Sequence, residues 1–372
     1  MITILSDDRI PFVSELFGNW GSLILKPGGS IRRNDLKTTN VLLIRSVTRV
    51  DADLLQNTSV EFVGSATAGF DHIDHKWLSK QSISWAYAPG ANAVAVSEYV
   101  LHCIAFLRRK NFLLQKASSA AVVGVGRVGQ TVSDRLKRIG FSIVHNDPLR
   151  TASEKTFVST SLDKLTEMDL ICLHTPLTKT GKFPTYHLID DVLLRKIKPG
   201  CVLLNAGRGE VIDNTALLGC DHLIVCLDVW ENEPNISLDL LQKVTIGTPH
   251  IAGYSKQAKL RASLMIYEAF LKHFQWSDTH LKRFKRRLKQ SFKKITYDDI
   301  GKCCTVEDVL LKIYNPGKET KIMKELLMRC SGQFENLRRN YQLREELASI
   351  RLLLKGMSTL NLKKFLKQWG FR

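Results

Sequence analysis

The chain has 372 residues, 44% of them hydrophobic, which is enough for two or three separate cores because single cores stop growing at roughly 250 to 300 residues. No window approaches the ~18 apolar residues of a membrane span. The start carries Asp7, Asp8 and Arg9 where a signal peptide needs an apolar stretch. We therefore expect a multidomain cytoplasmic protein with no membrane segment.

The formal net charge of +18 is concentrated in the last quarter of the chain, where residues 271–372 hold 24 Lys and Arg against 10 Asp and Glu. The densest part is a basic run that contains Lys282, Arg283, Lys285, Arg286, Arg287, Lys289, Lys293 and Lys294. Phe284, Leu288 and Phe292 recur every four residues within it, as on an amphipathic helix with a basic solvated face. The run favours a solvated face or the steering of an anionic substrate, with nucleic-acid binding as the alternative.

Eight cysteines are scattered along the chain, without a CxxC pair or a Cys/His cluster at zinc spacing. Free cysteine is most often a small buried hydrophobe. We expect reduced, mostly buried thiols and no metal site, with a metal ligand or a catalytic thiol as the alternative.

Three regions differ in their hydrophobic pattern. Residues 1–95 alternate short apolar runs with turn residues and helical stretches, which predicts a small α/β unit. Residues 96–254 repeat the pattern with longer, mostly β-branched runs, which indicate a parallel sheet buried on both faces. The runs are 2–5, 41–44 and 62–63 in the first region, and 122–123, 142–144, 170–173, 201–204, 223–227 and 244–246 in the second.

Long helical patterns at 92–110 and 257–274 flank the second region. Helices at these positions would join two domains and leave a cleft between them. The first domain is then discontinuous, with a return segment at about 255–280. From residue 281 the pattern changes to basic helices and short strands, so we expect residues 281–372 to form a third, appended domain.

A G-x-G-x-x-G motif follows a short apolar run and opens a helical pattern. Gly124 would make the tight turn, Gly126 would let a pyrophosphate approach the backbone, and Gly129 would allow close helix–strand packing. The phosphates would lie at the helix N-terminus, beside Arg127 and Val128, where free N–H groups attract anions. The alternative is a glycine-rich turn in an ordinary α/β domain.

Asp147 lies eighteen residues after Gly129, at the end of the next expected strand. A carboxylate there can hydrogen-bond the hydroxyl groups of the adenosine ribose and would repel the 2′-phosphate of NADP. NAD is therefore the expected coenzyme, although Arg150 is close by in the sequence.

Three charged or titratable residues follow separate apolar runs of the second region, where the carboxyl ends of parallel strands bind ligands. Oxidation of a secondary alcohol needs a base for the hydroxyl proton, and His250 is the candidate because histidine moves protons in both directions. Glu233 would fix the imidazole and stabilise its protonated form, while Arg208 would bind the substrate carboxylate. Asp228 would contact the nicotinamide carboxamide.

The segments that carry these residues, 204–209, 227–234 and 248–254, resemble the D-2-hydroxyacid dehydrogenase family. The resemblance matches Arg208, Glu233 and His250 to the family's catalytic Arg, Glu and His, and it implies coenzyme contacts at Thr175 and Gly253. It also implies the fold: an α/β chain with a Rossmann-type doubly wound NAD domain at 96–254 and a flavodoxin-like discontinuous substrate domain.

Narrower features resemble the branch of this family that oxidises 4-phospho-D-erythronate to 2-oxo-3-hydroxy-4-phosphobutanoate with NAD, in vitamin B6 synthesis. Segments 44–48 and 66–74 look like its substrate loops, which implies substrate contacts at Ser46 and Thr67, together with Tyr254. Segment 332–341 resembles its α+β C-terminal dimerisation domain, which implies a homodimer.

Several hypotheses stay open. One of the tail arginines, Arg338, Arg339 or Arg344, is a candidate to reach the substrate phosphate across the dimer. A 3-phosphoglycerate or other D-2-hydroxyacid dehydrogenase would share the same catalytic residues. A different class is an NAD-sensing dimeric binding protein of the corepressor kind, whose basic tail would touch nucleic acid or protein.

Overall fold

In the computed structural model the chain divides into two compact units, one of residues 1–92 and 255–291 and the other of residues 93–254 and 292–372. The structure describes residues 2–113, 118–279, 281–282, 285, 293–296, 305–353 and 366–371, with the backbone alone at 293–296 and 352–353. Residues 292–372 group with the second unit, and their role in dimerisation stays a prediction.

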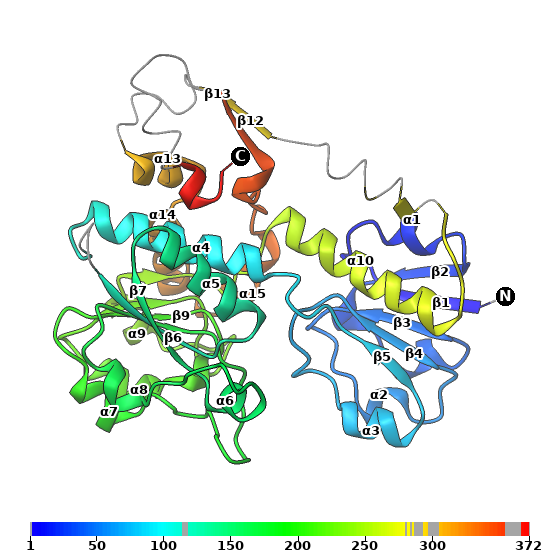
Figure 1. The fold of residues 1–372 in the computed structure, drawn as a ribbon. Helices are drawn as coiled ribbons and strands as arrows, with labels where there is room; N and C mark the ends of the chain where they lie inside the picture. Colours follow the sequence, from blue (N-terminus) through cyan, green and yellow to red (C-terminus); the bar gives the residue numbers. More distant parts are fainter. Residues whose placement is uncertain are drawn as a thin grey trace. The chain divides into compact units, whose positions relative to one another are not determined.

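The first unit is built on a five-stranded parallel sheet in the order β2-β1-β3-β4-β5 (Figure 1). The strands are β1 (Ile2–Asp7), β2 (Gly21–Lys26), β3 (Val41–Ile44), β4 (Phe62–Ser65) and β5 (Ser84–Ala86). The helices are α1 (Val13–Phe17), η1 (Gly28–Ser30), η2 (Arg33–Leu36), α2 (Ala52–Leu55), α3 (His75–Lys80) and α10 (Lys256–His273). This strand order is the flavodoxin-like one, which confirms the predicted fold.

Helix α10 returns the chain to the first unit. Its buried side chains Ile266, Tyr267 and Phe270 join one apolar cluster with Phe17 and Phe62. The rings of Phe17 and Tyr267 meet edge to face, with centroids 5.1 Å apart. The first unit therefore needs both segments of the chain to complete its core.

The second unit is built on a six-stranded parallel sheet in the order β11-β10-β9-β8-β6-β7. Figure 1 labels β6, β7 and β9 of this sheet. The strands are β6 (Ser119–Val123), β7 (Ser142–Asn146), β8 (Leu170–Leu173), β9 (Val202–Asn205), β10 (Ile224–Leu227) and β11 (Ile246–Gly247). The helices before the tail are α4 (Ala93–Arg109), α5 (Arg127–Arg138), α6 (Pro148–Ser153), η3 (Leu162–Leu165), α7 (Asp191–Lys196), η4 (Gly209–Val211), α8 (Asn214–Leu218) and α9 (Leu238–Lys243). The chain runs from β6 to β7 on one side and then back to β8 on the other, so β6 and β8 flank the switch point of a Rossmann-type sheet.

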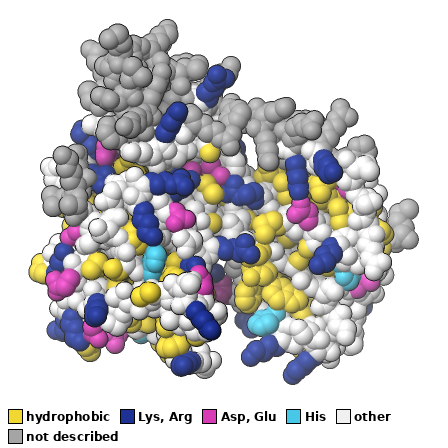
Figure 2. All heavy atoms as spheres, viewed as in Figure 1, with side chains coloured by type: hydrophobic (Ala, Val, Ile, Leu, Met, Phe, Trp, Pro, Cys, Tyr) yellow, Lys and Arg dark blue, Asp and Glu magenta, His cyan; other side chains and the backbone are white. Residues whose placement is uncertain are grey.

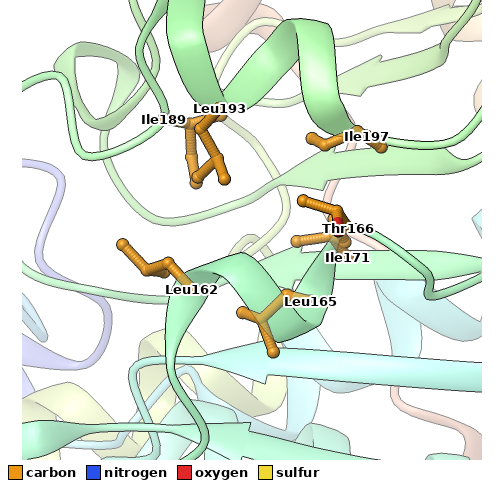
Figure 3. A pocket seen from close by; sticks show the side chains of 7 residues that line it. All are labelled: Leu162, Leu165, Thr166, Ile171, Ile189, Leu193 and Ile197. Carbon is orange, nitrogen blue, oxygen red and sulfur yellow. The ribbon is translucent and has the colours of Figure 1, made fainter.

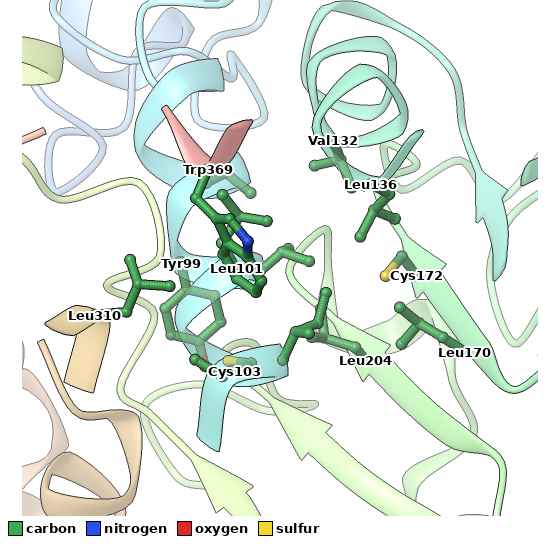
Figure 4. Packing of buried hydrophobic residues seen from close by; sticks show 14 of the residues in the cluster. Tyr99, Leu101, Cys103, Val132, Leu136, Leu170, Cys172, Leu204, Leu310 and Trp369 are labelled. Atoms are coloured by element: carbon green, nitrogen blue, oxygen red, sulfur yellow. The ribbon is translucent and has the colours of Figure 1, made fainter. Parts of the chain in front are cut away.

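The tail adds its own elements to this unit. They are β12 (Lys293–Thr296), α13 (Val306–Ile313), α14 (Pro316–Arg329), η5 (Ser331–Gln333), α15 (Phe334–Asn340), η6 (Leu347–Ser349) and β13 (Ile350–Leu353), and β12 pairs with β13 in parallel. Leu310 and Trp369 from the tail pack in one buried cluster with Tyr99, Leu101 and Leu136 (Figure 4). The described part of the tail thus shares the core of the Rossmann sheet.

A small apolar pocket lies between η3 and α7 (Figure 3). Its lining residues are Leu162, Leu165, Thr166, Ile171, Ile189, Leu193 and Ile197. Because only one of these side chains carries a polar group, the pocket offers little to a dinucleotide or an acid substrate. We interpret it as a packing gap.

The cysteines and the basic residues singled out in the sequence can now be placed in the structure. The six cysteines among the described residues are free thiols, five of them buried and Cys330 exposed, while Cys303 and Cys304 lie outside the described residues. Most of the basic run at 282–294 also lies outside them. On the face in Figure 2, the Lys and Arg side chains of the described residues are scattered among polar and apolar atoms. No helix in the described part of the chain is long and apolar enough to cross a membrane.

His102 of α4 should make stability depend on pH. Its Nδ1 donates to the carbonyl of Glu98 at 2.6 Å, and burial lowers the pKa of the ring from its ordinary value of 6.5 to about 3. The folded chain holds this ring neutral, whereas the unfolded chain protonates it below pH 6.5. The free energy of unfolding therefore has its full value above pH 6.5 and falls by about 1.4 kcal/mol for each pH unit between pH 6.5 and about 3. Urea unfolding of wild type and His102→Leu between pH 7 and 5 should give a shallower pH dependence for the variant, and parallel curves would contradict it.

Candidate active site

The glycine motif forms the loop between β6 and α5. Gly124 has φ +80°, which favours glycine, and its N–H donates to the carbonyl of Asn146 at 2.8 Å. A Cβ at Gly129 would lie 1.9 Å from the Gly124 carbonyl oxygen, so α5 can approach the loop only with glycine there. Gly126 is exposed, and a Cβ built on it meets nothing within 4 Å. The loop therefore has the close turn and the open helix N-terminus that a pyrophosphate needs, at Gly126, Arg127 and Val128.

Asp147 follows β7 and lies beside this loop. Its Oδ2 accepts from the Val125 N–H at 2.8 Å, and its Oδ1 accepts from the Arg150 N–H at 3.0 Å, which caps α6. The guanidinium of Arg150 donates to Glu154, Gln130 and the Val125 carbonyl. The arginine that could favour NADP is thus engaged by neighbours, and the contact of the Asp147 carboxylate with a ribose stays a prediction.

Replacing Asp147 with Asn should change coenzyme preference. The substitution keeps an oxygen acceptor but removes the negative charge, whose repulsion of a 2′-phosphate is worth about 1–2 kcal/mol near a protein surface. We expect the ratio of kcat/KM with NADP to kcat/KM with NAD to rise about tenfold. Initial rates with both coenzymes test this, and an unchanged ratio would show that Asp147 does not face the ribose.

Thr175 connects the glycine loop to the loop after β9. A Cβ at Gly124 would lie 2.7 Å from the Thr175 amide nitrogen, and a Cβ at Gly207 would lie 3.0 Å from its carbonyl oxygen. The Thr175 hydroxyl is buried without a hydrogen-bond partner among the described residues, so it has a donor to offer to a coenzyme. Both ring nitrogens of the preceding residue, His174, are likewise buried and unpartnered, and burial lowers its pKa to about 4. Sequence reasoning did not single out His174.

Arg208 lies in the loop after β9, directly before η4. Asn205 donates from Nδ2 to the Arg208 carbonyl at 2.8 Å, and Arg208 donates from Nη1 to the Gly207 carbonyl at 2.8 Å. A Cβ at Gly209 would lie 2.0 Å from the carbonyl of Trp230, so this loop packs directly on the segment after β10. The half-buried Arg208 is therefore held next to the segment that carries Glu233.

Glu233 and His250 form a carboxylate–imidazole pair. His250 Nδ1 lies 2.7 Å from Glu233 Oε2, and the Trp230 N–H donates to Glu233 Oε1 at 2.9 Å. Burial raises the pKa of Glu233, but the charge and hydrogen bond of His250, the Trp230 amide and the charge of Arg338 together hold it below its ordinary value. The carboxylate is thus ionised beside an imidazole whose side chain is 33% exposed. The structure brings these two predicted residues together, and their catalytic roles stay predictions.

Asp228 fixes the segment that follows His250. Its carboxylate accepts from the Ile251 and Ala252 N–H groups at 2.8 and 2.9 Å and from the Thr248 hydroxyl at 2.7 Å. Burial raises the pKa of Asp228, although the charge of His250 and these hydrogen bonds oppose it. Its contact with the nicotinamide carboxamide stays a prediction.

Arg344 of the tail holds the same segment from the carbonyl side. Its guanidinium donates to the carbonyls of Ile251 at 3.1 Å, Ala95 at 2.9 Å and Ala252, and the side chain is buried. Because both Nη groups are taken by the backbone and only the buried Nε is without a partner among the described residues, Arg344 does not fit the hypothesis that it reaches the substrate phosphate. It connects the tail to the loop of His250 instead.

The expected substrate contacts lie on both units. Ser46 and Thr67 follow the neighbouring strands β3 and β4, at the carboxyl edge of the first sheet. The Thr67 hydroxyl donates to the Gly69 carbonyl at 2.8 Å, while Ser46 is exposed. In the second unit Tyr254 follows the turn at Gly253, and its ring lies 6.2 Å from that of Tyr341.

One group in the second unit has donors for a metal ion: His187, Asp213 and Glu231 have ligand atoms within 4.8 Å of one another. Each is already engaged by the protein. His187 pairs with Glu231, Asp213 caps α8, and Glu231 also accepts from the Asn214 N–H. We interpret the group as a hydrogen-bonded support for the loops after β9 and β10.

Known proteins share this architecture. Residues 106–252 match the NAD binding domain of the D-isomer specific 2-hydroxyacid dehydrogenases. A 3-phosphoglycerate dehydrogenase from Entamoeba histolytica, solved with NAD+, has a TM-score of 0.62 and 22% identity, covering 74% of this chain and 95% of its own. A D-lactate dehydrogenase from Aquifex aeolicus, solved with NAD and lactic acid, has a TM-score of 0.59 and 23% identity, covering 73% and 95%. At these identities the likeness concerns the fold.

Two relatives match nearly the whole chain. An erythronate-4-phosphate dehydrogenase from Coxiella burnetii is 60% identical over 372 residues, which is all of both chains. One from Escherichia fergusonii is 37% identical over 364 residues, 96% of each chain.

The Rossmann-type sheet, the coenzyme loop and the matched domain define an NAD-dependent 2-hydroxyacid dehydrogenase. With 60% identity along its full length, the chain belongs to the erythronate-4-phosphate dehydrogenase family.

Proposed function

We propose that this protein oxidises 4-phospho-D-erythronate to 2-oxo-3-hydroxy-4-phosphobutanoate with NAD, a step in the synthesis of pyridoxal 5′-phosphate. The observation that carries the proposal is the pair of His250 and Glu233, joined at 2.7 Å in a chain 60% identical to an erythronate-4-phosphate dehydrogenase. An imidazole held by an ionised carboxylate is the base that oxidation of a secondary alcohol needs.

His250, Glu233 and Arg208 have different roles in the oxidation. His250 takes the proton of the C2 hydroxyl group while the C2 hydride leaves, and the C–O bond becomes a carbonyl. Bound NAD supplies the hydride acceptor. Glu233 stabilises the protonated imidazole, and Arg208 binds the substrate carboxylate and polarises the forming carbonyl. Two electrons leave as hydride and one proton goes to His250, so the step is balanced.

The coenzyme is assigned to the edge of the sheet at the switch point. Gly124, Gly126, Arg127, Val128 and Gly129 would hold the pyrophosphate, and Asp147 the adenosine ribose. We assign Thr175, Asp228 and Gly253 to the remaining coenzyme contacts. The unpartnered hydroxyl of Thr175 supports its assignment. On the substrate side we assign Ser46, Thr67 and Tyr254, from their match to the family.

The assembly and location are also proposed here. We infer a homodimer formed through residues 281–372, because relatives of this family match that region whereas the solved dehydrogenases cover only about three quarters of the chain. The free thiols fit a reducing cytoplasm. Light scattering on the purified chain tests the dimer, and a monomer at micromolar concentration would reject it.

A substrate panel tests the reaction. The purified protein is assayed with NAD and either 4-phosphoerythronate or 3-phosphoglycerate, and the absorbance of NADH is followed. We expect kcat/KM to be far higher with 4-phosphoerythronate. Preference for 3-phosphoglycerate would make this a phosphoglycerate dehydrogenase, and no turnover with either would favour an NAD-sensing binding protein.

A further inference from the structure

Helix α15 of the tail is anchored on the catalytic side of the second unit. Phe334 is fully buried in the apolar cluster that contains Trp230, and Leu337 packs against the same cluster. Trp230 is the residue whose N–H holds Glu233. The next residue of the helix after Leu337 is Arg338, so the packing of α15 fixes where this cation lies.

The guanidinium of Arg338 is only partly used by the protein. Its side chain is 15% exposed, and Nη1 donates to Glu335 at 2.7 Å. Its Nε is buried without a hydrogen-bond partner among the described residues. Because a buried N–H group without an acceptor is destabilising, this edge of the fork is suited to an oxyanion that arrives from outside the protein.

The charge of Arg338 acts on catalytic groups of the same chain. It is among the interactions that lower the pKa of Glu233. Burial works against the charged form of Arg338, but Tyr254, Glu335 and Glu233 outweigh it and raise the pKa of the guanidinium. Tyr254 is an expected substrate contact, and its ring lies 6.2 Å from that of Tyr341, which follows α15. Arg338 is therefore next to the groups that are assigned to the substrate.

We infer that Arg338 binds the phosphate group of the substrate, in the chain that also supplies His250. The inference rests on the proposed function, in which the substrate carries a carboxylate at one end and a phosphate at the other. Arg208 is assigned to the carboxylate, and the phosphate dianion needs a second cation. A guanidinium can hold two phosphate oxygens with Nε and Nη2. Both Nη groups of Arg344 donate to backbone carbonyls, so only its buried Nε is without a partner among the described residues and the two-point grip on a phosphate is blocked. Arg339 is exposed on α15.

The test compares substrates with and without the phosphate. Wild type, Arg338→Gln and the neighbouring control Arg339→Gln are assayed with 4-phosphoerythronate and with erythronate. We expect Arg338→Gln to lower kcat/KM for the phosphorylated substrate about 10- to 100-fold more than kcat/KM for erythronate, since the charged hydrogen bonds to phosphate are lost with one substrate only. Arg338→Lys should restore part of the difference, and Arg339→Gln should match wild type.

Each other outcome has a meaning. An equal loss with both substrates would overturn the inference and make Arg338 a positioning residue that acts through Glu233. No loss with either substrate would also overturn it. If wild type prefers 3-phosphoglycerate, the substrate proposal fails, but the pair of 3-phosphoglycerate and glycerate still tests Arg338. If wild type oxidises none of these, protection against thermal unfolding by 4-phosphoerythronate is compared in wild type and Arg338→Gln, and equal protection rejects phosphate binding.

Discussion

Replacement of His250 is expected to lower kcat by about 10²- to 10⁴-fold, the range that a general base contributes. The backbone at His250 has φ +58°, a conformation that Asn tolerates better than Ala. His250→Asn is therefore the better variant, because it preserves the turn and removes the base. His250→Ala adds backbone strain, so its stability must be measured beside its activity.

The measurement is kcat and KM with 4-phosphoerythronate, together with the affinity for NADH from fluorescence. We expect NADH binding to change little, because the phosphate loop is not altered. Glu233→Gln is the matched second variant: it keeps a side-chain oxygen for Nδ1 but removes the charge that stabilises the protonated ring. Its kcat should fall about 10- to 100-fold. Full activity in His250→Asn would contradict the proposed role of His250 as the general base.

The sequence predicted the strands that are buried on both faces. Apolar runs such as those of β3 and β8 are buried at every position, so hydrophobicity alone identifies them. It missed β2 and β5. In β2 the positions are half-buried or exposed, as on an edge strand, and β5 has only three residues. Both lie at the edges of the first sheet, where pairing with a single neighbour supports a strand whose burial pattern is weak.

The candidate site was likewise predictable from the sequence only in part. Glu233 and His250 could be paired from motifs, because each follows a strand of the same parallel sheet and such strand ends meet at one edge. The contact of Arg344 with Ile251 could not be predicted from motifs, since it joins residues 93 positions apart through the packing of the tail. The basic character of the tail suggested anion binding for Arg344, whereas its burial shows a structural use.

Replacement of Arg344 is therefore the second change from which we expect a large effect, on both stability and activity. The peptide groups of Ile251 and Ala252 are held on both sides, with their N–H groups on Asp228 and their carbonyls on Arg344. Arg344→Met removes these donors; the Ile251 carbonyl keeps the Tyr254 N–H at 2.8 Å and the Ala95 carbonyl lies within α4, so the loss is greatest at the Ala252 carbonyl. We expect the free energy of unfolding to fall by about 1 to 3 kcal/mol, the cost of leaving a buried acceptor without its donor.

The same variant should lose activity while it is still folded. His250 directly precedes the clamped segment, and a displacement of about 1 Å at a reacting group costs about 10²-fold in rate. Kinetics at low temperature and urea unfolding separate the two effects. Arg344→Lys keeps the charge but cannot span several carbonyls, so it should lie between wild type and Arg344→Met in both measurements. If Arg344→Met loses stability but keeps wild-type kcat, the tail only supports the fold. A joint loss instead means that the tail sets the position of the catalytic imidazole.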